Sequence, residues 1–162
     1  MSGDLLIGWG NPLRGDDGVG QAIAAAVERW GQPQLVVVEA VQLTPELAPL
    51  LAAARRVLFV DAEAGAAAVT GGWRLEPVQP LEPVPPLEPG GTTAAWSSPP
   101  LSHQASPGVL LMLAETLYGR RPPAWQLLVT AHACGFGSGL SPATEALLPG
   151  ALAAVRLWCG DA

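Results

Sequence analysis

The sequence has few cysteines and few basic residues. Its two cysteines, Cys134 and Cys159, do not form a CxxC pair and cannot build a disulfide framework. Lysine and arginine together number 8 against 14 acidic residues, which gives a net charge of −6. This balance argues against nucleic acid or an anionic membrane as the main partner, because both attract basic surfaces. A basic peptide is compatible with it.

The sequence also has no long apolar run. None of its runs approaches the roughly 20 residues of a transmembrane helix. The first four residues, Met1-Ser2-Gly3-Asp4, lack the basic start of a signal peptide. We therefore expect a soluble, cytoplasmic protein that has no membrane as a partner.

Hydrophobic residues make up 49% of the 162 residues and charged residues 14%, which is typical of a globular chain with a sizeable core. We predict a single domain spanning residues 1–162. Strands are predicted at four apolar runs and one edge segment: 4–9, 35–38, 57–60, 127–129 and 67–75. The run 35–38 is predicted to be a buried strand. Helices are predicted where apolar residues recur at helical spacing: 17–30, 44–54, 109–117 and 141–159. The apolar stripe of the last helix is predicted to be Leu148, Leu152, Val155 and Cys159.

Continuous apolar strands that alternate with amphipathic helices predict an α/β fold. We expect three layers, with a twisted, mostly parallel sheet between helices on both faces. Residues 76–107 break the pattern and contain many of the chain's 17 prolines. We predict a Pro-rich loop there, because such long connections are usually functional or disordered. Within it, residues 76–102 are predicted to be mobile or to pack weakly on the core.

The most informative segment is residues 5–20. An apolar run ends in a Gly-x-Gly turn, and a tight loop leads to two adjacent carboxylates, Asp16 and Asp17. A parallel sheet places such a loop at the carboxyl ends of its strands, where ligands bind. A dinucleotide site is disfavoured, because its third glycine would fall on Leu13 and a phosphate would meet carboxylates. The two acids either cap the following helix or serve a site, and both alternatives stay open.

Three further polar residues are candidates for a site. Asp61 directly follows four apolar residues, His103 directly precedes a predicted helix, and His132 ends the last apolar strand. The alternatives are a loop cap for Asp61 and idle, exposed side chains for the histidines. Two carboxylates and an imidazole suit a divalent metal such as nickel or zinc. The sequence spacing does not show that they converge.

Residues 5–20 are similar to the N-terminal signature of the hydrogenase maturation endopeptidases. The resemblance extends to Gln42–Leu47 and to Gly139–Pro142, and it covers nearly the whole chain. It implies that Asp17, Asp61 and His103 are the metal ligands, since they match the family's three ligands in order and approximate spacing. The segment Gln42–Leu47 resembles the branch that serves NAD-reducing, bidirectional hydrogenases.

The resemblance implies an endopeptidase that removes the C-terminal extension of a [NiFe]-hydrogenase large-subunit precursor after nickel insertion. The nickel would belong to the substrate, and the peptidase would probe for it. Other divalent ions could take the place of nickel. No organic cofactor is expected, and the chain is expected to act as a monomer. Water could be activated by the metal or by a carboxylate, and the sequence leaves both open.

Three other functions remain to be separated from this one. A non-cleaving assembly factor would dock on the same precursor without changing its mass. A peptidase of the same architecture could act on another protein, such as a spore protein. A small-molecule hydrolase is the third, although no Gly-x-Ser-x-Gly nucleophile motif occurs in the sequence.

Overall fold

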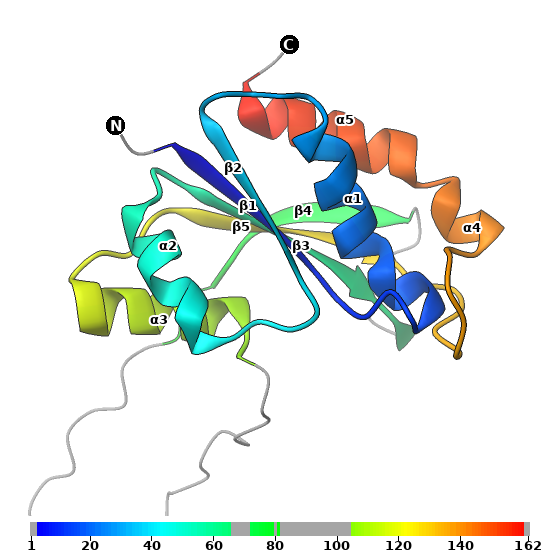
Figure 1. The fold of residues 1–162 in the computed structure, drawn as a ribbon, viewed down its shortest axis with the longest axis horizontal. Helices are drawn as coiled ribbons and strands as arrows, with labels where there is room; N and C mark the ends of the chain where they lie inside the picture. The colour runs from blue at the N-terminus through cyan, green and yellow to red at the C-terminus, as the bar shows by residue number, and fades with distance from the viewer. Residues whose placement is uncertain (1–2, 66–71, 80, 82–104, 161–162) are drawn as a thin grey trace, which may run out of the picture.

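Five strands form one sheet within the described part of the computed structural model, which covers residues 3–65, 72–79, 81 and 105–160 (Figure 1). They lie in the order β2-β1-β3-β5-β4. Their bounds are Asp4–Trp9 (β1), Leu35–Ala40 (β2), Val57–Glu63 (β3), Trp73–Pro77 (β4) and Ala124–Thr130 (β5). Every neighbouring pair is parallel except β4 and β5, which are antiparallel. The predicted, mostly parallel sheet is therefore confirmed.

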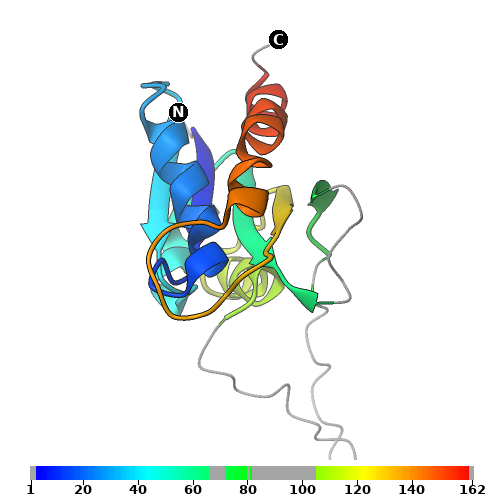
Figure 2. The same cartoon turned by 90° about the vertical axis from the view of Figure 1, so that its right-hand side faces the viewer.

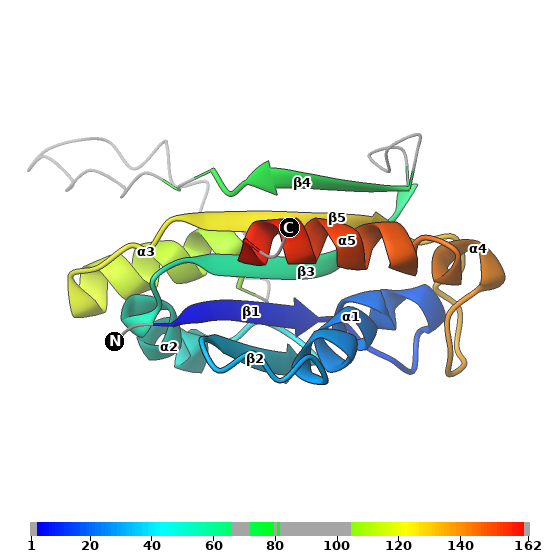
Figure 3. The same ribbon diagram turned by 90° about the horizontal axis from the view of Figure 1, so that it is seen from above.

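Helices cover both faces of this sheet, which confirms the predicted three-layer α/β arrangement (Figure 3). Helices α1 and α5 lie on one face, and α2 and α3 lie on the other. The α-helices are Val19–Glu28 (α1), Ala48–Ala53 (α2), Pro107–Tyr118 (α3), Pro142–Glu145 (α4) and Leu148–Cys159 (α5), with 3-10 turns at Gly15–Gly18 and Pro45–Leu47. Within the described ranges, no helix has both the length and the apolar character needed to cross a membrane.

Side chains of the inner strands alternate between two apolar cores. In β3, Leu58 and Val60 pack with α1 and α5, whereas Val57 and Phe59 pack with α2 and α3. All four are fully buried, and each contributes roughly 1.5–3 kcal/mol on leaving water. This alternation fixes the register of the strand, since a slip by one residue would exchange its faces. The register thereby also determines that Asp61 is the residue that follows the buried part of β3.

Two glycines of the 5–20 segment allow α1 to lie directly on the sheet. A Cβ atom on Gly20 would lie 2.4 Å from both the Trp9 and the Val60 carbonyl oxygens. A Cβ atom on Gly8 would lie 2.1 Å from the Gly20 carbonyl oxygen. These glycines are therefore required by close packing of helix on strand, and they set how near the helix start lies to the ends of β1 and β3.

Gly20→Ala should destabilise the protein by about 3 kcal/mol, because backbone atoms of two strands would have to move. Chemical denaturation measures this difference. Gly135→Ala is the matched control, since a Cβ atom there meets nothing within 4 Å. Equal stability of the two variants would contradict the packing argument.

Two predicted details of the core are wrong. The run 35–38 was expected to be a buried strand, but β2 lies at the sheet edge and Val36 is 53% exposed. An apolar run alone does not distinguish an inner strand from an edge strand. The buried face of α5 is also displaced from the predicted stripe Leu148, Leu152, Val155 and Cys159. It consists of Ala151, Ala154, Val155 and Trp158.

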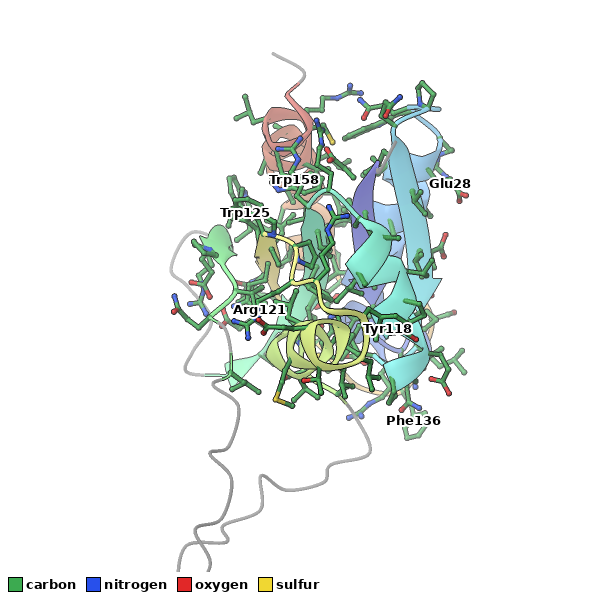
Figure 4. The ribbon with its side chains drawn as sticks, turned by 90° about the vertical axis from the view of Figure 1, so that its left-hand side faces the viewer. Glu28, Tyr118, Arg121, Trp125, Phe136 and Trp158 are labelled. Atoms are coloured by element: carbon green, nitrogen blue, oxygen red, sulfur yellow. The ribbon has the colours of Figure 1, made fainter. Side chains whose placement is uncertain are left out.

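Trp158 explains the displaced stripe of α5. Its indole packs edge to face on Trp125 of β5, with ring centroids 6.4 Å apart (Figure 4). The guanidinium of Arg56 lies over the same indole, 4.4 Å from the ring centroid. This aromatic contact and the neighbouring small alanines bring the face bearing Trp158 onto the sheet, while Leu148, Leu152 and Cys159 are only partly buried.

The prediction of a Pro-rich loop at about 76–107 falls mainly on residues outside the described ones. Its first two positions belong to β4, and Pro107 begins α3. The predicted edge strand at 67–75 is present as β4 but begins later, at Trp73, directly after Gly72 with a φ of +98°. Residues 66–71 lie outside the described part of the chain.

Candidate functional site

The carboxyl ends of β1, β3 and β5 meet at one edge of the sheet, which we call the carboxyl edge. Figure 2 looks onto this edge. The loop of residues 10–18 follows β1, Asp61 follows the buried part of β3, and the loop of residues 131–141 follows β5. Strands β1 and β3 are parallel neighbours, with Gly8 opposite Val60, so their next residues come out side by side. Ligands of open α/β sheets bind at such an edge.

The loop of residues 10–18 is tightly folded around Asn11 and Asp17. The Asn11 side-chain oxygen accepts a hydrogen bond from the Leu13 amide at 2.9 Å. The Asn11 amide donates to Asp17 Oδ2, also at 2.9 Å. Gly10 has a φ of +135°, and a Cβ atom there would lie 1.9 Å from the Asp17 carbonyl oxygen. Gly10 thus allows the chain to fold back after β1, and the Asn11 amide holds the Asp17 carboxylate in a half-buried position.

Asp61 lies within β3 and does not end it, because the strand continues to Glu63. The expected strand end at Asp61 is therefore wrong, although its side chain does leave the fully buried part of the strand. Asp61 Oδ1 accepts a hydrogen bond from the Ala62 amide at 2.7 Å. Burial raises the pKa of Asp61 to about 7, and this rise prevails over the lowering effect of the Ala62 N–H group. The negative charges of Asp17 and Glu63 raise the pKa further.

The structure thus places Asp17 and Asp61 close enough for their charges to interact. A raised carboxyl pKa beside another carboxylate is the electrostatic environment of a cation site, since a bound cation would relieve the repulsion. Among the described residues, no three histidine, cysteine or acidic side chains gather to hold a metal ion. His103, the third predicted ligand, lies outside the described residues.

Asp61→Asn should stabilise the protein at alkaline pH. The folded-state pKa of about 7 lies above the ordinary value of 3.8, so the native state keeps a proton that the unfolded chain has lost. The free energy of unfolding therefore falls between about pH 4 and pH 7. Removing this carboxyl group should raise stability by about 2–4 kcal/mol at pH 8 and hardly at all at pH 4. Thermal unfolding at both pH values measures the difference.

The exposed Glu28 supplies the control for this pH dependence. Glu28→Gln also removes one carboxylate, but it should change stability by the same small amount at both pH values. If Asp61→Asn behaves like Glu28→Gln, the raised pKa of Asp61 is contradicted.

Asp16 has neither of the two roles left open by the sequence. It is fully buried, and its carboxylate does not cap the helix that follows it. It accepts hydrogen bonds from the amides of His132 (2.8 Å), Ala133 (2.7 Å) and Ser141 (2.6 Å). It also accepts from the hydroxyls of Ser141 (2.7 Å) and Thr144 (2.8 Å). We call this group of five donors the Asp16 cluster.

The Asp16 cluster stabilises the charged form of its carboxylate. Burial acts to raise the pKa of Asp16, but the hydrogen bonds from Ser141, Ala133 and Thr144 outweigh it and hold the pKa well below its usual range. The donors follow Asp16 in sequence by 116 to 128 residues. No local sequence signal announces such partners. The visible signs were only an acid beside another acid, and the Ser141-Pro142 start of a helix.

The Asp16 cluster also sets the tautomer of His132. Thr144 Oγ1 has one proton, and its two acceptors are the Asp16 carboxylate and the Thr130 carbonyl oxygen. Its proton is therefore not available to His132 Nδ1, which lies 2.8 Å away. In this contact the Nδ1–H group donates and Thr144 Oγ1 accepts. When the ring is neutral, Nε2 is left as the acceptor on an exposed side chain.

Gln21 is a further residue of the edge that sequence reasoning missed. Its side-chain amide donates to the carbonyl oxygens of Gly10 (2.9 Å) and Ala40 (2.8 Å). It therefore fastens the ends of the neighbouring strands β1 and β2 to α1. A glutamine one turn into a helix gives no sequence signal for this role.

These features define an open α/β fold with two interacting carboxylates at the carboxyl edge of a parallel sheet. In sequence, no family model and no curated protein matches this chain. In structure, it is similar to the hydrogenase-maturating endopeptidase HybD from E. coli, with a TM-score of 0.68 and 20% identity over 99% of this chain and 93% of that one.

Two archaeal structures show the same likeness. The [NiFe] hydrogenase maturation protease HycI from Thermococcus kodakarensis has a TM-score of 0.68 and 16% identity, over 98% of this chain and 93% of that one. The hydrogenase 2 maturation peptidase from a Thaumarchaeota archaeon has a TM-score of 0.63 and 19% identity, over 99% of this chain and all (100%) of that one. The chain therefore has the fold of the hydrogenase maturation endopeptidases along essentially its whole length.

Proposed function

We propose that this chain is an endopeptidase that removes the C-terminal extension of a [NiFe]-hydrogenase large-subunit precursor after nickel insertion. The observation that supports it most directly is the pair of interacting carboxylates, Asp17 and Asp61, at the carboxyl edge of a fold shared with such endopeptidases. The peptidase works as a monomer in the cytoplasm, and the precursor is its partner.

In this proposal the nickel ion is part of the substrate. Asp17 and Asp61 supply carboxylate oxygens to it and His103 supplies an imidazole nitrogen, a donor set that suits nickel and other divalent ions. Three protein ligands leave positions for groups of the precursor, so the same site tests whether the metal has been inserted. The carboxylates attract the cation, since the charge of Asp17 already disfavours ionisation of Asp61.

The experiment is incubation of the purified chain with nickel-loaded and nickel-free large-subunit precursors, followed by mass spectrometry. We expect the mass of the C-terminal extension to be lost from the nickel-loaded precursor alone. The first precursor to try is that of an NAD-reducing, bidirectional hydrogenase, because Gln42–Leu47 resembles that branch.

Each alternative outcome has a distinct meaning. Stable binding without loss of mass would identify a non-cleaving assembly factor. Equal cleavage of both precursors would contradict the role of nickel. If neither hydrogenase precursor is bound or cleaved, the substrate belongs to another class of protein.

A further inference from the structure

Two large apolar side chains lie exposed at the carboxyl edge. Phe136 is 101% exposed, and Leu13 is 64% exposed. They belong to the loops of residues 131–141 and 10–18, which lie against each other (Figure 2). In the opposite view, the labelled Phe136 lies at the margin of the molecule, beyond the ribbon (Figure 4). Burying such an exposed aromatic ring against another surface is favourable, because it removes apolar area from water.

The loops that present these side chains are firmly held. The Gly137 amide donates to the Leu13 carbonyl oxygen at 3.0 Å, and the Gly15 amide donates to the Gly137 carbonyl oxygen at 2.9 Å. The Asp16 amide donates to the Ala133 carbonyl oxygen at 2.9 Å. The Asp16 carboxylate in turn binds the amides of Ala133 and Ser141, near the two ends of the loop of residues 131–141. A partner that covers Phe136 and Leu13 therefore pays little conformational entropy for ordering this backbone.

Arg14 directly follows Leu13, and its backbone pairs with Gly137, the residue after Phe136. Arg14 is exposed. It forms no ion pair with any other described residue, whereas Arg55 and Arg56 bind Asp4 at the opposite end of β1. Asp17 and Asp61 lie at the same edge, as does Glu63, which is ion-paired with Arg74 of β4. An exposed arginine without an ion pair among the described residues favours a partner that brings a carboxylate to it.

A shallow hollow lies beside the same two loops. It has a volume of about 250 Å³, and Pro12, Gly139 and Leu140 are among its lining residues. Its size suits one apolar side chain of a docked segment.

We propose that Leu13, Arg14 and Phe136 form a docking surface for the hydrogenase precursor, which offers it a segment with apolar side chains and a carboxylate. The inference rests on the proposed function. The loop that presents Leu13 and Arg14 also fixes Asp17 through the Asn11 amide, so a segment docked here lies beside the carboxylate pair. A second copy of this chain is a poor occupant, because the net charge of −6 makes the copies repel.

The test compares steady-state cleavage of the nickel-loaded precursor by the full-length wild type and by Phe136→Ala and Arg14→Glu. We expect KM to rise at least about tenfold for each, with kcat changed less than about threefold, because the surface binds and does not react. Phe136→Trp and Arg14→Lys should keep most of the wild-type affinity. Leu157→Ala is the matched control, since Leu157 is 70% exposed on α5, and its KM should not change.

Three results would overturn the docking surface. One is unchanged KM for Phe136→Ala and Arg14→Glu while the wild type cleaves, which would leave the proposed function standing. Another is an equal rise in KM for Leu157→Ala. The third is a wild type that dimerises in sedimentation and a Phe136→Ala variant that does not, with KM unchanged. A wild type that neither binds nor cleaves any nickel-loaded precursor would overturn the proposed function together with this inference.

Discussion

Asp17→Asn should abolish cleavage of the nickel-loaded precursor and leave the protein folded. The amide keeps an oxygen that accepts the hydrogen bond from the Asn11 amide, so the loop of residues 10–18 is retained. It loses the negative charge that attracts a divalent cation, and a neutral amide is a weak ligand. Precursor cleavage, measured beside the thermal unfolding temperature of each variant, checks this. Asp17→Glu should be the mildest change, because it keeps the carboxylate and its negative charge.

His103→Ala should have the same effect on cleavage as Asp17→Asn, since it removes the proposed imidazole ligand. His132→Ala is the matched histidine control and should process the precursor normally or nearly so. Full activity of His103→Ala would falsify the nickel-probing hypothesis, and the assembly-factor alternative would then be favoured.

Asp16→Asn should destabilise the protein by about 3–5 kcal/mol, which is the largest stability effect we expect. A single amide oxygen would replace two carboxylate oxygens, and the amide N–H groups would face the donors of the Asp16 cluster. Bonds to a charged acceptor are also stronger than bonds to a neutral one. Urea denaturation gives the free energy of unfolding, and the expected loss corresponds to roughly 10 °C in unfolding temperature.

Ser141→Ala serves as the graded control for the Asp16 cluster. It removes one hydroxyl donor and keeps the Ser141 amide, so it should cost about 1–2 kcal/mol. Asp17→Asn, one residue away from Asp16, should cost less than either. A loss below about 1 kcal/mol for Asp16→Asn would show that the cluster does not hold the two loops together.

The sequence allowed the sheet and its covering helices to be predicted, because both periodicities are local. The strand at 4–9 has the predicted bounds, and the apolar runs of β3 and β5 are at the expected positions. The position of β2 at the sheet edge and the face that α5 buries were not predicted. Both depend on neighbours that are distant in the sequence. Trp158, for example, is held against the sheet by its contacts with Trp125 and Arg56.

The candidate site was predictable only in part, for the same reason. Asp17 and Asp61 follow strands whose ends can be located, so their common edge follows from parallel pairing. The neighbouring Asp16 looks equivalent to Asp17 in sequence but has a wholly different environment. Its donors follow it by 116 to 128 residues in the sequence. No motif spacing connects them to Asp16.

The Asp16 cluster has a consequence for the order in which this protein folds. Its carboxylate receives its donors only when residues 132–144 have been synthesised and have folded against the loop of residues 10–18. Closing so long a loop is entropically costly and comes late in folding. Until then the Asp16 carboxylate lacks its hydrogen-bond donors, and the loops of residues 10–18 and 131–141 are not held together. The carboxyl edge is therefore one of the last parts of the molecule to be completed during biosynthesis, so a newly made chain becomes able to act on another protein only after its own C-terminal third is in place.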